Sequence, residues 1–535
     1  MRSKQLAIKN TCAGGVLLAA LLLGACTKNF EKYNTDPNKV TEDQLKGDGQ
    51  DVGSFFPDMQ ISIIRTVDWE YQLQQNLNAD VYCGYMMSGD PFVGGKNNTN
   101  YAMIPDWNTY PFDLAYSHVM SNWLVIKQRA QATKPDYYAV ANIIKVLALH
   151  RVTDVYGPLP YTKYGQGGFT AAYDDQATIY KTFFQELDSS VLVLSAYVAD
   201  HPDAKPFANF DLVYGGDYTK WIKLANSLRL RLAMRIVYAD PVMAKQEAEA
   251  AVKNSYGTLT TNDDIAKVNM VNGTTYINPL ADISHDWSDI SMNAQMESFM
   301  VGYTDPRISK YFMPSSEGSS GFKGIRSGID IINGSDYTDF SQLKFTYTDL
   351  IKLMVPAETY FLKAEGTLRG WDMGGASVQS LYEKGIATSF DQYAAGAADT
   401  YVADNVSKPL PYTDPKNANN NIPAGSPYLS TITIKWEESA SFEQKLERII
   451  TQKWLALYPD GEEAWAEYRR TGYPKLFPVV VNYSGGTIST TDHIRRLPFP
   501  SSEVTNNATA VQQATANLLG GPDNGSTKLW WDKKS

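Results

Sequence analysis

The chain has 535 residues, a formal net charge of −10 and 43% hydrophobic residues. An acidic chain without a basic stripe excludes a nucleic-acid-binding role and electrostatic attachment to anionic lipid. The length is ample for a large apolar core and by itself allows roughly two to four domains.

The N-terminus carries a targeting signal. Arg2, Lys4 and Lys9 precede an apolar run over residues 16–23, which is shorter than the roughly 20 residues that span a bilayer. The run ends in LGAC at 23–26, the small-residue pattern at which a bacterial lipoprotein precursor is cut and its cysteine acylated. We therefore expect removal of residues 1–25 and lipid on Cys26, although an ordinary signal peptide with an incidental cysteine is the alternative.

The residue after the lipidation site and the remaining cysteines refine this expectation. Thr27 stands where the inner-membrane retention signal has aspartate, so the outer membrane is the expected destination. Cys12 leaves with the signal and Cys26 takes lipid, which leaves Cys83 without an intrachain partner. No later run is long enough for a transmembrane helix, so the lipid is the only expected link to the membrane.

The mature chain begins with a polar tether over 26–53, and 54–535 are expected to form one domain. Apolar residues then recur at spacings of three and four over 112–132, 136–155, 177–198 and 217–238. In the last of these segments Trp221 and Leu224 share the apolar face, while Arg231 and Arg235 are assigned to the others. Successive helix pairs of this kind predict a mainly α fold with TPR-like pairs, an α-solenoid scaffold, although no strict 34-residue period is visible.

Two irregular insertions interrupt the helical pattern, at about 256–353 and 394–433. Both are rich in polar and turn-forming residues, and irregular segments of this length inside a folded protein usually carry function. They predict a large irregular ligand-binding lobe. Helices are expected again over 356–371, 441–458 and 461–471, and Trp530 and Trp531 near the terminus are expected to dock on the core.

Seven segments spread over nearly the whole mature chain resemble the SusD/RagB family of outer-membrane lipoproteins, in particular its SusD-like branch. They are NTDPN (34–38), DVYGPLPY (154–161), WIKLANSLRLR (221–231), PAETYFLKAE (356–365), QKWLALY (452–458), EYRRTGYP (467–474) and RRLPFP (495–500). Each segment alone is weak evidence. Together, in one order and behind a lipidation signal, they are highly specific.

The resemblance implies a helical scaffold with an irregular lobe that captures a nutrient at the cell surface. It further implies a TonB-dependent outer-membrane barrel, of the SusC type, over which the lipoprotein sits as a lid. The ligand is expected to be an oligosaccharide, or in some members a peptide, delivered without chemical change. The family is non-enzymatic and implies no cofactor.

A surface glycoside hydrolase and a purely structural lipoprotein are the alternatives from other classes. Glu462, Glu463 and Glu467 lie within two helical turns, whereas a retaining glycosidase needs two carboxyls about 5 Å apart across a cleft. Because Arg469 and Arg470 follow them, charge pairing on an exposed helix is the expected explanation. The sequence therefore predicts no catalytic residue.

No metal centre or cofactor site is predicted either. The five histidines are far apart in the chain and form no metal-spaced pair. Asn34, Asp36 and Asn38 alternate like calcium ligands, but Lys39 and Leu45 occupy the positions that require glycine and glutamate, which excludes an EF-hand.

Candidate ligand residues are aromatic and polar side chains in the irregular segments. Aromatic rings stack on sugar faces, and a few polar groups nearby select the ligand. The alternative reading is that these rings fix helix entries and loops to the core. The predicted set is Trp107, Trp287, Tyr101, Phe92, Asn100 and Asp286.

Overall fold

A computed structural model describes residues 49–168, 170–269, 277–317 and 320–534 of the chain. The chain divides into a unit that ends at Asp51 and a unit from Val52 to Ser535, and the fold below is that of the second unit. The signal at 1–25, Cys26 and the tether up to residue 48 lie outside the described residues, while α4 (Gln50–Gly53) spans the division.

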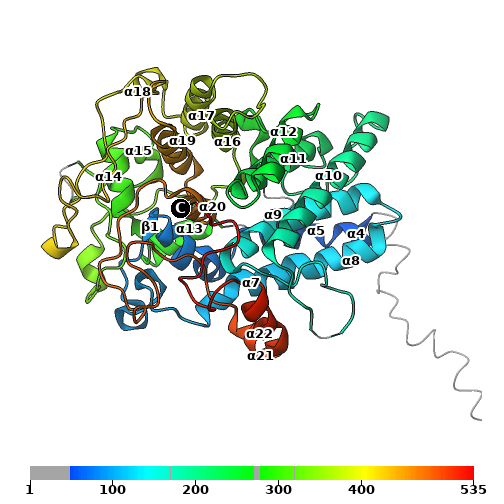
Figure 1. Ribbon diagram of the computed structural model, residues 1–535, viewed down its shortest axis with the longest axis horizontal. Coiled ribbons are helices and arrows are strands. Elements are labelled where there is room, and N and C mark those ends of the chain that lie inside the picture. Colours follow the sequence, from blue (N-terminus) through cyan, green and yellow to red (C-terminus); the bar gives the residue numbers. More distant parts are fainter. Residues whose placement is uncertain (1–48, 169, 270–276, 318–319, 535) are drawn as a thin grey trace, which may run out of the picture. The chain divides into compact units, whose positions relative to one another are not determined.

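The long helices pack on their neighbours in chain order, as the predicted helix pairs require. Figure 1 shows α8 to α12 on one side of the view, with α16, α17 and α19 beside them, and contacts link α8 to α9, α9 to α10, α10 to α11 and α11 to α12. Contacts from α11 to α16 and from α16 to α17 and α19 continue the series. The long helices are α8 (Ser121–Ala130), α9 (Pro135–Tyr156), α10 (Gln176–Asp200), α11 (Tyr218–Arg235), α12 (Pro241–Lys253), α16 (Pro356–Leu368), α17 (Val378–Gln392), α19 (Phe442–Leu457) and α20 (Gly461–Thr471).

Local sequence signals set the ends of these helices. The Asp175 and Asp217 side chains accept hydrogen bonds from the first-turn amides of α10 and α11. Ser441 and Gln444 form a capping box at the start of α19, and Gly472 ends α20 in a left-handed conformation. The segment predicted over 112–132 is α7 (Tyr110–Leu114), the π-helix η5 (Ala115–Met120) and α8 in succession.

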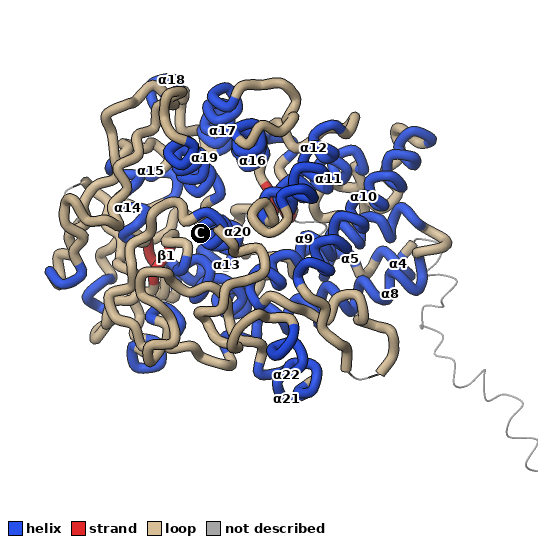
Figure 2. The backbone as a smooth tube through the Cα atoms, viewed as in Figure 1, coloured by secondary structure: helices blue, strands red, loops and turns tan. Residues whose placement is uncertain are grey.

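The remainder is mostly loop with short elements, and Figure 2 shows loops gathered around α14, α15 and β1. Its strands form two antiparallel pairs, β1 (Met86–Met87) with β3 (Ser291–Met292) and β2 (Ala266–Val268) with β4 (Ile351–Met354). The short helices are α5 (Phe56–Ile61), α6 (Asp68–Tyr71), the π-helix η1 (Gln72–Asp80), η2 (Phe92–Gly95), η3 (Asn98–Asn100), η4 (Trp107–Thr109), η6 (Asn262–Asp264), α13 (Pro279–Ala281), the π-helix η7 (Asp282–Asp286), α14 (Ala294–Gly302), α15 (Ile308–Tyr311), η8 (Gly334–Tyr337), α18 (Asp399–Val402), η9 (Ala418–Asn420), α21 (Ser501–Asn506) and α22 (Ala508–Asn517).

Two helices are buried on more faces than their sequences predict. In α11, Arg231 and Arg235 lie away from the apolar face of Trp221 and Leu224, but they are 1% and 0% exposed, so this side of the helix is buried as well. The expectation that α20 is exposed is wrong, because Glu463 and Glu467 are each 3% exposed. The predicted charge pairing is confirmed for Glu467 with Arg470, whereas Arg469 donates to backbone carbonyls. Glu463 and Glu467 also pair with Arg235 of α11, which explains how these charges tolerate the interior.

The buried charges form one connected network between five helices, which we call the ion cluster. Arg231 of α11 forms a bidentate ion pair with Glu358 of α16, with hydrogen bonds of 2.8 and 2.5 Å. Arg235 reaches Glu463 and Glu467 of α20 at 2.6 and 3.0 Å. The members are Asp154, Arg231, Arg235, Glu358, Glu365, Lys453, Glu463, Glu467 and Arg470.

Electrostatic complementarity keeps the cluster charged. Burial alone would raise the pKa of Glu463, but Arg235, Arg231 and Lys453 lower it to about 2. Arg470 donates to both oxygens of Glu365, each at 2.7 Å, and also to Glu467. Arg470 and Lys453 likewise lower the pKa of Glu467 against the effect of burial, and Arg470 and Arg369 lower the pKa of Glu365.

The C-terminal aromatic residues dock on this region, which confirms their predicted role. Trp531 is fully buried, and its indole N–H donates to Asp154 Oδ1 at 2.8 Å. Asp532 accepts from Arg495 at 2.5 and 2.7 Å. Cys83 is buried and free, as the cysteine count predicted.

Another buried carboxyl, that of Asp80, lies where η1 packs against α20. Asp80 accepts hydrogen bonds from Tyr71, Gln75 and Asn76 at 3.0, 2.8 and 3.1 Å. A Cβ atom at Gly461 would lie 2.2 Å from Asp80 Oδ1, so only glycine fits at the first residue of α20. Burial raises the pKa of Asp80 to about 7, although these three bonds act in the opposite direction.

The ion cluster predicts a large stability loss when one partner is neutralised. Glu467→Gln removes one of the carboxylates that compensate the buried charges of Arg235, Arg470 and Lys453, so we expect a loss of about 3–5 kcal/mol in the free energy of unfolding. Urea unfolding measures it. Lys245→Ala is the control, because Lys245 is 51% exposed and pairs with Glu249 at 3.8 Å on the surface; its cost should stay below about 1 kcal/mol. Equal losses in both variants would contradict the assignment.

The raised pKa of Asp80 predicts that the free energy of unfolding decreases as the pH rises. The pKa of Asp80 is about 7 in the folded chain and near 4 in the unfolded chain. Between these pH values the folded chain holds a proton on Asp80 that the unfolded chain has lost. Raising the pH from 4 to 7 therefore lowers the free energy of unfolding. Asp80→Asn removes this penalty. At pH 8 the variant should be more stable than the wild type by at least about 1 kcal/mol, since one pKa unit corresponds to about 1.4 kcal/mol. At pH 4 the difference should vanish, and a difference that does not depend on pH would refute the explanation. Urea unfolding at both pH values makes the comparison.

Candidate functional site

Large aromatic side chains are exposed on two neighbouring short elements. Trp69 of α6 is 47% exposed, and Trp287, directly after η7, is 39% exposed. The elements α6 and η7 are in contact. Exposure of tryptophan is costly in water, and two such residues on adjoining elements indicate a binding surface.

Further rings adjoin these two residues. Trp69 packs edge-on against Tyr110, the first residue of α7, with ring centroids 5.7 Å apart. Phe92 packs edge-on against Trp107 of η4, with centroids 5.9 Å apart and an interplanar angle of 84°. Because η4 directly precedes α7, both pairs lie in one region, which we call the aromatic surface: Trp69, Phe92, Trp107, Tyr110 and Trp287.

Polar groups accompany the rings. The Tyr347 hydroxyl, on a side chain that is 42% exposed, donates to Asp286 Oδ1 at 2.8 Å. Gln72 donates to Asp289 at 2.8 Å. Gln72 is buried, whereas the Asp286 carboxylate and the Tyr347 hydroxyl are exposed and are suited to orienting a hydroxyl-rich ligand that stacks on the rings.

The carboxyls beside Trp287, those of Asp282 and Asp286, do not have the arrangement of a retaining glycosidase. Burial and a hydrogen bond with Asp286 raise the pKa of Asp282 above its ordinary value. Both carboxyls belong to one turn of η7 and do not stand on opposite sides of a cleft. The Glu462, Glu463 and Glu467 set lies in the buried interior of α20, away from any open surface.

Asn100 holds a loop and makes no contact with solvent. It is fully buried, donates to the carbonyl of Gly95 at 2.6 Å and accepts from the amide of Asn97 at 3.0 Å. Asn97 in turn donates to the carbonyl of Phe92 at 3.0 Å. These bonds hold the turn 92–95, in which Val93 has a left-handed backbone with φ 53°, a strained state for a β-branched residue.

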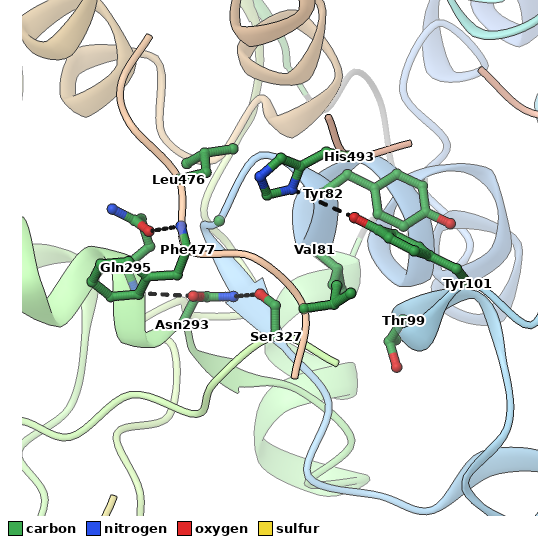
Figure 3. Close-up of a pocket in the computed structure, with 12 residues that line it drawn as sticks. Val81, Tyr82, Thr99, Tyr101, Asn293, Gln295, Ser327, Leu476, Phe477 and His493 are labelled. Atoms are coloured by element: carbon green, nitrogen blue, oxygen red, sulfur yellow. Dashed lines mark hydrogen bonds between the residues drawn. The ribbon is translucent and has the colours of Figure 1, made fainter. Parts of the chain in front are cut away.

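Tyr101 also lies in the interior, at a narrow cavity shown in Figure 3. The residue is 2% exposed, and its hydroxyl lies 3.5 Å from His493 Nδ1. Gln295 and Phe477 line another side of the same cavity, where the Gln295 side-chain oxygen Oε1 accepts a hydrogen bond from the Phe477 backbone N–H. The cavity volume of about 20 Å³ is that of one water molecule and is too small for a sugar ring.

The structure thus separates the predicted residues into two groups. Phe92 and Trp107 lie together on the aromatic surface, and Asp286 and Trp287 are adjacent on its other side. Asn100 and Tyr101 are interior residues of the loop that carries Phe92.

Sequence reasoning missed Trp69, Tyr110 and Tyr347. Trp69 and Tyr110 belong to short helices with no amphipathic pattern long enough to show which side faces solvent. A tryptophan between two acidic residues, Asp68 and Glu70, was the one available signal of exposure.

The part of the chain that the structure describes contains neither a metal-ligand cluster nor a helix that could span a membrane. Within residues 49–168, 170–269, 277–317 and 320–534, no group of three or more His, Cys, Asp or Glu side chains is arranged to hold a metal ion. In the same part of the chain, no helix combines the length and the apolar character needed to cross a bilayer.

Comparison with solved structures gives close matches over nearly the whole chain. A chitin-binding SusD homologue from Flavobacterium johnsoniae is 44% identical, with a TM-score of 0.86 and coverage of 90% of this chain and 99% of that one. A SusD homologue from Bacteroides uniformis is 38% identical, with a TM-score of 0.84 and the same coverage. A SusD homologue from Bacteroides vulgatus is 35% identical, with a TM-score of 0.86, and covers 92% of this chain and 99% of that one.

The family comparison agrees. No curated protein matches the chain. The family described as "Susd and RagB outer membrane lipoprotein" matches residues 32–532. The helix pairs and the structural matches confirm the predicted mainly α, TPR-like fold. The chain belongs to the SusD/RagB family of outer-membrane lipoproteins.

Proposed function

We propose that this protein captures oligosaccharides on the aromatic surface and delivers them unchanged to a TonB-dependent outer-membrane barrel of the SusC type. The observation that carries the proposal is the pair of exposed tryptophans, Trp69 and Trp287, on the contacting elements α6 and η7. The chitin-binding relative, which is 44% identical, supports a glycan as ligand.

The chemistry of the surface suits a sugar chain. The apolar face of a pyranose ring packs on an aromatic face, while its hydroxyls hydrogen-bond to groups at the edge. Trp69 and Trp287 supply faces, and Asp286 and Tyr347 supply edges. Phe92 fixes the orientation of Trp107 through their edge-on contact, and Asn100 and Tyr101 support the loop rather than touch the ligand.

Peptide capture by the same surface is the second candidate, since exposed tryptophans also bind apolar peptide side chains. A surface glycoside hydrolase is the third, and the position of Asp282 and Asp286 on one turn of η7, rather than on opposite sides of a cleft, counts against it. A panel of oligosaccharides and peptides, assayed for both retention and cleavage, separates the three. Retention of a glycan without product supports capture, whereas cleavage refutes it.

Delivery requires the protein to lie at the outer membrane, facing the cell exterior. We propose that the acylated Cys26 provides the anchor, with the tether over 26–53 linking it to the folded domain. No cofactor or metal takes part in the proposed cycle.

The aromatic surface predicts the effect of removing its rings. Trp287→Ala and Trp69→Ala should each weaken binding of the retained oligosaccharide about tenfold or more, which corresponds to about 1.4 kcal/mol of lost stacking. Isothermal titration calorimetry measures the affinity. Phe442→Ala is a matched control, because Phe442 on α19 is also 39% exposed and should leave the affinity unchanged. Unaltered binding in both tryptophan variants, with the fold intact, would remove these residues from the site.

The proposed lipid anchor predicts that the protein is found in the membrane fraction, and the proposed barrel partner predicts a complex that can be purified. Cys26→Ala should move the protein from the membrane fraction to the soluble fraction, because no other membrane attachment is proposed. The wild-type protein, purified from detergent-solubilised outer membranes, should carry a large barrel protein with it. Retention of the variant in the membrane would refute the anchor, and purification without a barrel would favour a structural lipoprotein.

A further inference from the structure

An open depression lies next to the aromatic surface. Its volume is about 510 Å³, within the range of small-molecule sites. Its walls come from η4, α7 and η5 on one side and from α21 on the other. The depression is lined by Asp106, Thr109, Tyr110, Asp113, Leu114, Ser117, His118, Ser501, Ser502, Thr505 and Asn506.

Hydrogen bonds between the two walls hold the depression open. Ser502 donates to Asp113 Oδ1 at 2.7 Å, and the hydroxyls of Thr109 and Ser501 lie 3.0 Å apart. The depression is therefore formed before any ligand arrives, which reduces the entropy that binding must overcome.

The lining offers unused hydrogen-bonding groups of the kind that sugars require. The side chains of Asp106, Tyr110, Ser117 and Asn506 make no hydrogen bond to other described residues. The lining contains no lysine or arginine. Carboxylate, hydroxyl and amide groups match the hydroxyls of a neutral sugar, and the two aspartates disfavour sulfated or uronic sugars.

Tyr110 connects the depression to the aromatic surface. One side of its ring packs edge-on against Trp69, and the residue also lines the depression. Two other open depressions of similar size lie between α10 and α12 and on α17. Neither is lined by a residue of the aromatic surface.

We propose that this depression is an additional subsite, which receives the sugar units of a neutral oligosaccharide that extend beyond Trp69. The inference rests on the proposed capture function and adds to it a direction for the bound chain. A short oligosaccharide occupies the aromatic surface alone, and a longer one also reaches α21.

The test uses the N-acetylglucosamine dimer and hexamer as probes. The variant Ser117→Leu/Asn506→Leu fills the depression at two exposed positions, where substitution has little effect on folding. Titration calorimetry should show hexamer affinity reduced about tenfold relative to the wild type, with dimer affinity unchanged. The matched control is Gln379→Leu/Ser380→Leu in the depression on α17, which should alter neither affinity.

Three other outcomes of the titrations are distinguishable. Wild-type hexamer affinity in the Ser117→Leu/Asn506→Leu variant would overturn the subsite and leave the capture function intact. Loss of dimer and hexamer affinity together would overturn the division between surface and subsite. Failure of the wild type to bind either probe would refute capture of chitin fragments, and the subsite with it.

Hydrogen exchange on the wild-type protein gives an independent measurement that needs no variant. The hexamer should slow amide exchange in residues 109–118 and 501–506, whereas the dimer should not. Equal exchange with and without the hexamer, under conditions where calorimetry shows binding, would overturn the proposal.

Discussion

The ion cluster is the constraint on which the arrangement of helices depends. Arg231 and Arg235 of α11 meet Glu358 of α16 and Glu463 and Glu467 of α20 with almost no access to water. A buried charge without its partner is far more costly than an apolar mismatch. The cluster therefore permits only one register between α9, α11, α16, α19 and α20, and it makes the helical scaffold a rigid support for the loops around it.

That support reaches the aromatic surface through a short series of contacts. Glu463 and Glu467 lie on α20, whose first residue, Gly461, packs directly on Asp80 at the end of η1. The helix η1 continues α6 without a break, and α6 carries Trp69. The position of the exposed Trp69 ring thus depends on the buried charges of α20, which are linked to it through η1 and α6. Rigid placement of rings lowers the entropy lost on binding, which suits capture of a ligand that is released unchanged.

The site was predictable in part, and the reason differs between residues. Trp107, Phe92 and Trp287 are large rings in irregular segments, and composition alone identifies them as candidates. Asn100 shares the same loop, yet its amide satisfies the carbonyl of Gly95. Tyr101 turns inward at a left-handed backbone position with φ 67°. Which loop side chains face solvent depends on such backbone bonds, and these leave no periodic trace in the sequence.

The sequence by itself determined the helices that bury an apolar stripe, the free thiol of Cys83, the docking of Trp531 and membership of the family. Those features are local patterns, or motifs kept in a fixed order, and each can be read without knowing its neighbours in space. Only the tertiary structure decided which partners Arg231, Arg235, Glu463 and Glu467 meet in the interior and that Trp69 and Tyr110 adjoin an open depression. Amphipathic patterning assigns charge to the outside of a helix. It cannot anticipate a partner helix, distant in sequence, that supplies the opposite charge within hydrogen-bonding distance.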